Sequence, residues 1–250
     1  MGIIIRNMNA TTGLTHVRMG GGSSSIGGGA GGSLVTSATG CEGREVGYYG
    51  EVAAADFFTG AELASLLNVT QGNLQNSDTD WFKFSIDGKV LFVPKRTIRH
   101  SISWNHLYSR GLVYGTDDNG VAPTGTPTNQ LRVVSKDGFD YKVRLLTGGS
   151  GDPHNGSTVH STANCSEWNE LMYRVSTSNP NGTENNFAMY TDVQLNVSSG
   201  NGRQTWTQEQ FSDGSTTRII RGNSSVRVLY PHTSSDTHTN RGWRPVLELL

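Results

Sequence analysis

The sequence predicts an α+β fold in which two helices are set among many strands and long loops. Residues 81–94 contain two apolar runs separated by an Asp-Gly pair, which is typical of a β-hairpin. Segments 103–111 and 165–175 instead carry their large apolar residues at helical spacing. Stretches rich in Asn, Ser, Thr and Gly separate these segments, and we expect them to form the loops.

Composition excludes several classes of protein. The chain has 250 residues, which is enough to bury a sizeable core. Only 16% of the residues are charged, against about 25% in typical domains, while the apolar share is average, so disorder and a helical bundle are both disfavoured. The formal net charge of −1 provides no field that would attract a nucleic acid. Because no run approaches about 18 consecutive apolar residues, we expect no membrane insertion.

The N-terminal segment and the cysteines bear on the cellular compartment. The apolar run in residues 1–6 is too short for the core of a signal peptide, so we expect no secretory address of the usual kind. Cys41 and Cys165 lie far apart in unlike sequence contexts. Without a secretion signal, a pair of unlinked thiols is favoured, and a single disulfide remains the alternative.

Three regions differ in composition. Residues 1–47 form an extended glycine-rich arm, whose run at 20–32 cannot pack a core. We expect this arm to become ordered against a partner, with a flexible tether as the alternative. Residues 48–80 hold a short helix and a polar connector, and residues 81–250 form the main domain.

The short helix of the second region has both a start signal and an apolar face. Thr59 and Glu62 form a capping box, in which each side chain can satisfy a backbone amide at the helix start. Leu63, Leu66 and Leu67 then recur at helical spacing, which predicts one buried face.

The main domain alternates strand and helix signals. Apolar positions predict strands at 81–86, 90–93, 141–145, 218–221, 225–230 and 243–250. The two expected helices each bury a tryptophan, and the apolar faces of these elements place four tryptophans in the core: Trp81, Trp104, Trp168 and Trp243. We expect Arg244 to brace the fold through hydrogen bonds to loop carbonyls.

Three segments of the main domain carry a family resemblance. Residues 221–226 resemble an Arg-Gly-Gly-Ser turn and strand, residues 242–247 resemble a terminal Gly-Phe-Arg-Pro-Val-Leu strand, and residues 166–173 match a helix with a core tryptophan. In this order, and together with the hairpin at 81–94, they resemble the C-type-lectin-like fold of formylglycine-generating enzymes and phage tropism determinants. The resemblance spans about two-thirds of the chain and implies a C-type-lectin-like domain, preceded by the arm and the short helix.

A second resemblance concerns biological context. Residues 72–84, 88–95 and 102–104 are similar to segments of tailed-bacteriophage virion proteins, especially tail-fibre, collar and decoration components. This similarity implies a virion location, with assembly in the host cytoplasm. It also implies that residues 1–47 attach to other virion proteins, and we expect homo-oligomers, with a trimer favoured. The attachment residues would be Ile3, Ile4, Ile5 and Arg6.

The candidate ligand-binding residues lie in and between the long polar loops. Residues 148–163 and 230–241 are rich in groups that form adaptable hydrogen bonds, which suits a glycan or protein surface as well as an ordinary solvated loop. Trp206 has polar neighbours, so we expect it to be an exposed platform on which a sugar could stack. The full set of candidates is Asp152, His154, Asn155, Trp206, Gln208, His232, Asp236 and His238.

No arrangement of residues predicts catalysis, a cofactor or a metal. Asp152, His154 and Cys165 lack zinc-ligand spacing, and the calcium–sugar motifs of true C-type lectins are absent. Neither cysteine lies where the formylglycine-generating branch places its reactive pair. We therefore expect a non-enzymatic virion protein of the tail, fibre or collar that binds the host surface. The alternatives are a capsid decoration protein without a receptor role and an oxidoreductase-like enzyme on the formylglycine-generating scaffold.

Overall fold

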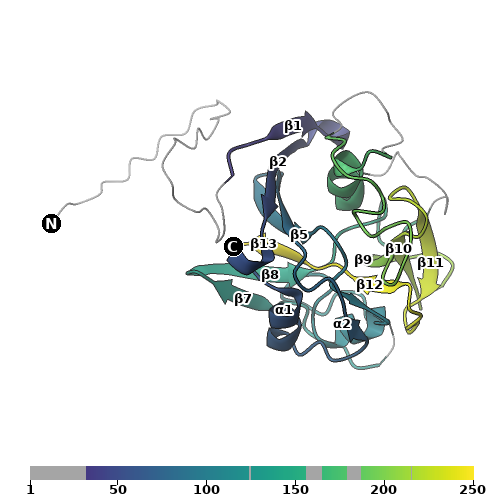
Figure 1. Ribbon diagram of the computed structural model, residues 1–250. Helices are drawn as coiled ribbons and strands as arrows, with labels where there is room; N and C mark the ends of the chain where they lie inside the picture. Colours follow the sequence, from purple (N-terminus) through teal and green to yellow (C-terminus); the bar gives the residue numbers. More distant parts are fainter. Residues whose placement is uncertain (1–31, 124, 156–164, 179–186, 215) are drawn as a thin grey trace, which may run out of the picture.

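The computed structural model describes residues 32–123, 125–155, 165–178, 187–214 and 216–250. It shows a sheet-rich fold with 33% strand and 14% helix, in agreement with the coarse α+β expectation. The strands form two sheets (Figure 1). In spatial order, the seven-stranded sheet contains β1 (Thr36–Thr39), β2 (Glu45–Val52), β4 (Trp81–Ile86), β5 (Lys89–Pro94), β13 (Val246–Leu249), β8 (Phe139–Arg144) and β7 (Val133–Lys136). The six-stranded sheet contains β11 (Leu229–Thr233), β10 (Thr217–Gly222), β9 (Gln204–Gln210), β12 (Arg241–Trp243), β6 (Arg99–His100) and β3 (Asn73–Leu74).

The helical elements of the described chain are short. They are the α-helices α1 (Gly60–Leu66) and α2 (Trp104–Ser109), the π-helix η3 (Trp168–Tyr173), and the 3₁₀ turns η1 (Cys41–Gly43) and η2 (Ala54–Asp56). None of the helices described here is long and apolar enough to cross a bilayer. In Figure 1, α1 and α2 lie together at the bottom of the molecule, away from β1 at the top.

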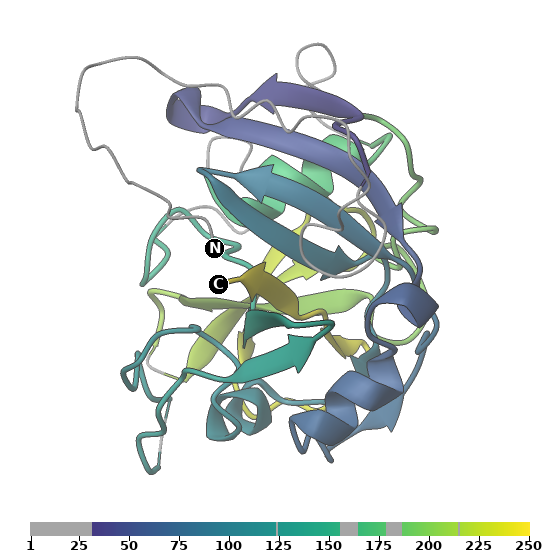
Figure 2. The same ribbon diagram turned by 90° about the vertical axis from the view of Figure 1, so that its left-hand side faces the viewer.

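The core is divided by the seven-stranded sheet. Along β5, Leu91 and Val93 belong to one apolar cluster and Phe92 to the other, and along β13, Val246 and Leu247 divide in the same way. Because successive side chains on a strand point to opposite faces, the two clusters lie on the two faces of this sheet. Figure 2 shows the strand order from purple β1 and β2 at the top, through blue β4 and β5 and yellow β13, to teal β8 and β7.

Each face of the seven-stranded sheet has its own cover. The six-stranded sheet contributes Trp206, Ile220 and Trp243 to one cluster, together with the buried residues of α1 and α2. The helix η3 covers the other face and contributes Trp168 and Met172. The central strands are therefore buried on both sides, which explains why β4 is almost continuously buried.

The expected hairpin and the expected second helix are confirmed, and the expectation for the first helix is confirmed except for Leu66 and half of its capping box. Asp87 (φ 51°) and Gly88 (φ 76°) adopt the left-handed conformation that a tight hairpin turn requires. Thr59 Oγ1 accepts a hydrogen bond from Glu62 N at 3.1 Å, and Ser103 Oγ caps α2 in the same way. The capping box is only half formed, because the Glu62 carboxylate binds Lys136 Nζ at 3.0 Å. Leu63 and Leu67 are buried, whereas Leu66 is 59% exposed.

The expected tryptophan core and the role of Arg244 are also confirmed. The four tryptophans that the sequence predicted to lie in the core are all fully buried. Arg244 donates to the carbonyls of Pro94 and Lys95 from Nη1 at 3.1 and 2.7 Å, and to that of Leu195 from Nη2. Its guanidinium also lies over Trp168, which stacks on Arg221 as well. The last strand prediction, 243–250, is interrupted at this point, so β12 and β13 belong to different sheets.

The expected boundary between arm and domain is wrong. It falls at residue 47, inside β2, which pairs with β4 along its length. Ala38 and Val46 are buried in the same cluster as Trp168, so the chain from β1 onward belongs to the main fold. Glycines interrupt the apolar pattern of β2 in the sequence, and for that reason the strand gave no recognisable signal. Residues 1–31, with most of the glycine run, lie outside the described residues.

The expected connector at 48–80 is not a separate region either. Phe57 and Phe58 are fully buried and share a cluster with Trp104 and Trp243. The indole of Trp81 donates to Phe58 O at 2.7 Å, which ties this segment to the first strand of the hairpin.

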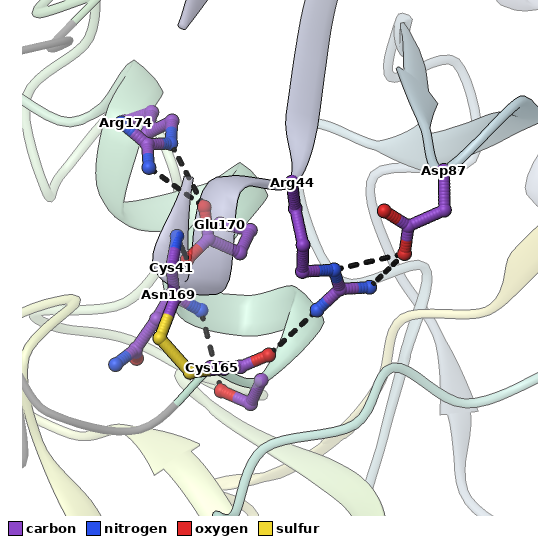
Figure 3. Close-up of a disulfide and its surroundings, with 8 residues drawn as sticks. Cys41, Arg44, Asp87, Cys165, Asn169, Glu170 and Arg174 are labelled. Atoms are coloured by element: carbon purple, nitrogen blue, oxygen red, sulfur yellow. Dashed lines mark hydrogen bonds and ion pairs between the residues drawn. A yellow bond between two sulfur atoms is a disulfide. The ribbon is translucent and has the colours of Figure 1, made fainter. Parts of the chain in front are cut away.

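The preference for unlinked thiols is also wrong. Cys41 and Cys165 are joined by a disulfide that connects η1 to the start of η3, with their Cα atoms 5.3 Å apart (Figure 3). Arg44 donates to Cys165 O at 2.8 Å and to Asp87 Oδ2, and Glu170 accepts from Cys41 N at 3.0 Å. The pairing of β1 and β2 with the rest of the sheet brings together two cysteines that are 124 positions apart, and this approach leaves no local trace in the sequence.

Candidate functional site

A surface hollow of about 650 Å³ lies beside β11, at one edge of the six-stranded sheet. Its volume falls within the range of small-molecule sites in proteins. We call it the β11 hollow, and it is lined by Gln204, Asn223, Tyr230, Pro231, His232, His238, Asn240 and Arg241. Figure 1 shows β11 at the right-hand edge, on the other side of the molecule from the start of the described chain.

Three strands, β9, β11 and β12, and the loops after β10 and β11 position these side chains. Tyr230 and His232 belong to β11, opposite Ile220 and Arg218 of β10. Gly222 ends β10 at φ 87°, and a Cβ there would meet Arg203 O at 2.3 Å, so only glycine allows this close approach. The approach holds Asn223 beside Arg203, whose Nε donates to Asn223 Oδ1 at 3.2 Å.

Arg241 is the central charged group of the hollow and is 7% exposed. It donates to Asp236 Oδ2 from Nε and Nη2, at 2.8 and 2.6 Å. Nη2 also lies 2.8 Å from His232 Nδ1. Asp236 Oδ1 accepts in turn from His238 N at 2.8 Å. This network orders the loop after β11 and pairs the guanidinium with a carboxylate.

The protonation states follow from these contacts. Burial, and then the charge of Arg241, lower the pKa of His232 to about 4. His232 is therefore neutral at physiological pH, and its Nδ1 accepts from Arg241. Burial raises the pKa of Asp236, but the hydrogen bonds from His238 N and Arg241 outweigh that effect and hold it below its ordinary value. Arg241 and Asp236 therefore form a pair of one positive and one negative charge.

The carboxamide of Gln204 is the unsatisfied group of the hollow. Gln204 is 4% exposed, and its Oε1 has no hydrogen-bond partner among the described residues. A buried acceptor without a partner is rare in native proteins and calls for a physical reason. Gln204 lines the hollow, but its Oε1 has no solvent-accessible surface, so a ligand donor would reach it only if the carboxamide turned toward the hollow.

Three of the candidate residues from the sequence come together at this hollow. His232, Asp236 and His238 lie around Arg241, as the loop composition suggested. Gln204, Asn223, Tyr230 and Asn240 were missed. Gln204 belongs to β9, a strand with little apolar pattern in the sequence, so its position next to the last loop was not foreseeable.

The expectation for Trp206 is wrong. Its side chain is fully buried, and its Nε1 donates to Ile102 O at 2.7 Å. Trp206 packs with Ile220 and Trp243 in the core, because β9 is a central strand covered by the other sheet. It provides no surface for a sugar.

The remaining candidates lie at the other end of β9. Gln208 donates to Leu145 O at 2.7 Å, and Asp152 Oδ1 accepts from Gln210 N at 2.9 Å. His154 is 1% exposed, which contradicts its expected role as a surface ligand-binding residue. Asn155 is exposed. Because Gln204 and Gln210 stand at opposite ends of a strand about 20 Å long, this group does not belong to the β11 hollow.

A buried carboxylate lies close to this second group. The backbone N–H of Gly148 is shared by both carboxylate oxygens of Glu209, each 2.9 Å from the nitrogen. Burial raises its pKa to about 7, although the backbone hydrogen bonds oppose the shift. Arg221 lies near it and donates to Gly148 O. The Glu209 carboxylate faces the protein interior. It therefore affects the stability of the fold and does not line the β11 hollow.

The expected attachment residues lie outside the described residues. They are Ile3, Ile4, Ile5 and Arg6. Among the residues that the structure describes, no three His, Cys, Asp or Glu side chains form a group that could hold a metal ion. No family model, curated protein or solved structure matches this chain.

Proposed function

We propose that this chain is a non-enzymatic structural protein of a tailed-bacteriophage virion, in the tail, fibre or collar. Its N-terminal residues would attach it to the particle, and its C-type-lectin-like domain would bind a glycan or protein on the host surface. The resemblances at 221–226, 242–247 and 72–104 motivate this proposal. The arrangement of the first two segments supports it. Arg221 of the first segment and Arg244 of the second both pack on Trp168, so the two segments meet at one tryptophan of the core.

The β11 hollow is the observation that carries the binding role. It combines a half-exposed aromatic ring, carboxamides and an ion-paired arginine at a sheet edge remote from the start of the described chain. A domain attached through its N-terminus would therefore present the hollow away from its point of attachment. An open hollow of this kind gives weak single-site affinity, and a homo-oligomer would increase it through avidity.

The disulfide is compatible with a particle surface. Disulfides persist in oxidising environments, which include the surfaces of virions, and are rare in the cytosol. Cys41 and Cys165 would therefore become joined after assembly or release.

The attachment role can be tested by deletion. Removing residues 1–31 leaves every described strand intact, whereas removing 1–47 also deletes β1, Cys41 and the start of β2. We expect the chain lacking 1–31 to fold with an unchanged melting temperature and to be absent from purified particles. Normal incorporation of this deletion would disprove attachment through the N-terminal residues.

The binding role needs a separate test. We expect the labelled full-length chain to bind host cells and to compete with phage adsorption. Absence of cell binding by a folded chain that still enters particles would favour the alternative, a capsid decoration protein without a receptor role.

A further inference from the structure

We propose that the β11 hollow binds an uncharged saccharide without the help of a divalent cation. This inference rests on the proposed host-surface function and names the class of ligand for that site. It follows from three features of the hollow: its charge balance, its carboxamides and its apolar side.

The charge balance disfavours an anionic ligand. Arg241 is the cation that lines the hollow, and its guanidinium already makes two hydrogen bonds to Asp236. His232 is neutral and accepts from the same guanidinium. A carboxylate or sulfate ligand would meet a paired charge and would have to displace Asp236. The charge of Arg241 is therefore compensated by Asp236.

The carboxamides suit hydroxyl groups. Gln204 Oε1 is a buried acceptor without a partner among the described residues, and a turn of this carboxamide toward the hollow would let a ligand hydroxyl satisfy it. Asn223 accepts from Arg203 through Oδ1, so its amide group is left to donate. Asn240 adds a third carboxamide at the rim. Each carboxamide offers a donor and an acceptor, and a sugar hydroxyl has the same double character.

The apolar side fits the carbon-bound hydrogens of a sugar ring. Tyr230 is 37% exposed and stands next to Pro231 on β11. An aromatic ring offers a flat apolar face with a polar tip, and sites of this kind combine apolar lining with few directed polar groups. One face of a saccharide can therefore lie against Tyr230 while its hydroxyls reach the carboxamides.

The carboxylate at the hollow is not free to bridge a cation. Asp236 Oδ2 is held by Arg241, and Oδ1 accepts from His238 N. Calcium requires several oxygen ligands, of which carboxylates are the strongest. The described residues that line the hollow include no Asp or Glu, and both oxygens of Asp236, which pairs with Arg241, are engaged. Binding should therefore be independent of calcium.

The experiment compares neutral and acidic glycans. The full-length chain is applied to an array of neutral hexose and N-acetylhexosamine oligosaccharides, beside oligosaccharides that contain uronic or sialic acid. We expect signal on neutral members, competition by free methyl glycosides, and less than about a twofold change with EDTA or with about 0.5 M NaCl.

Variants tie the signal to the hollow. Tyr230→Ala and Gln204→Leu should each weaken neutral-glycan binding by about tenfold or more. Asn240→Ala, at the rim, provides a variant whose folding is not at risk. Val193→Ala removes an apolar side chain that is 62% exposed and lies outside the hollow, so it should bind like the parent chain.

The outcomes separate this inference from the proposed function. Cell binding that persists while the array responds only to acidic glycans, or that requires calcium, would overturn the inference and leave the host-surface role intact. The same holds if cell binding persists but all three hollow variants bind like the parent chain. If the folded chain binds neither cells nor any glycan, the proposed function itself is overturned.

Discussion

The disulfide between Cys41 and Cys165 should contribute a large part of the stability of this protein. Replacing both cysteines by serine removes a cross-link that spans 124 positions, about half of the chain. A cross-link stabilises mainly by restricting the unfolded chain, and for a loop of this length the chain-entropy relation gives about 5 kcal/mol. That amount is comparable to the total stability of many domains.

Other contacts of the N-terminal segment are much weaker. The ion pair between Arg44 and Asp87 joins side chains that are 25% and 43% exposed, and pairs of this kind contribute about 0–1 kcal/mol. The pairing of β1 and β2 with β4 remains in the double-serine variant, so the variant should still fold. The loss should therefore show as reduced free energy of unfolding and not as loss of the native state.

Urea unfolding, followed by tryptophan fluorescence, measures this loss. We expect the double-serine variant and the reduced parent chain to unfold at the same lower urea concentration, and with a larger m-value, because the open chain exposes more surface. Reducing agent should have no effect on the double-serine variant, which makes it the control. A loss below about 1 kcal/mol, or thiols that titrate in the unfolded, unreduced parent chain, would refute the reasoning.

Three further predictions concern buried side chains. Glu209 has a pKa of about 7 when folded and about 4.5 when unfolded, so between these values the folded state retains a proton that the unfolded chain has lost. The free energy of unfolding should then fall by about 3 kcal/mol as the pH rises from 4.5 to 7, and Glu209→Gln should abolish this decrease in urea titrations; an unchanged pH profile would contradict the assignment. Trp206→Ala should lower stability by about 3–5 kcal/mol, because it empties a core position, and in conditions where the variant is folded it should keep glycan binding if Trp206 is no sugar platform. Arg244→Met leaves three carbonyls without their donor, those of Pro94 and Leu195 in buried hydrogen bonds, and should cost about 3 kcal/mol in thermal or urea unfolding, while a neutral result would contradict the bracing role of Arg244.

Local signals in the sequence were reliable. The Asp87-Gly88 turn, the cap at Thr59 and the apolar face of α2 were all found where neighbouring residues in the chain decide the conformation. The physical reason is that a tight turn or a helix start depends on groups within about four positions of one another.

Strands with mixed patterns were not recognisable. β2 is interrupted by glycines and β9 is composed largely of polar residues, yet each is paired on both sides within its sheet. Their burial comes from the second layer that covers them, and so Trp206 was expected at the surface and lies in the core. Alternation of polar and apolar residues indicates a strand only where one face meets solvent.

The sequence by itself determined the composition of the surface, the positions of the turns and helix caps, and the loop residues His232, Asp236 and His238 that take part in the candidate site. The tertiary structure alone decided that Cys41 meets Cys165, that β1 and β2 belong to the main sheet, and that Gln204 reaches the last loop. These pairings bring together residues far apart in the chain, and the packing of two sheets on a common core selects them, because no neighbouring residue carries that information.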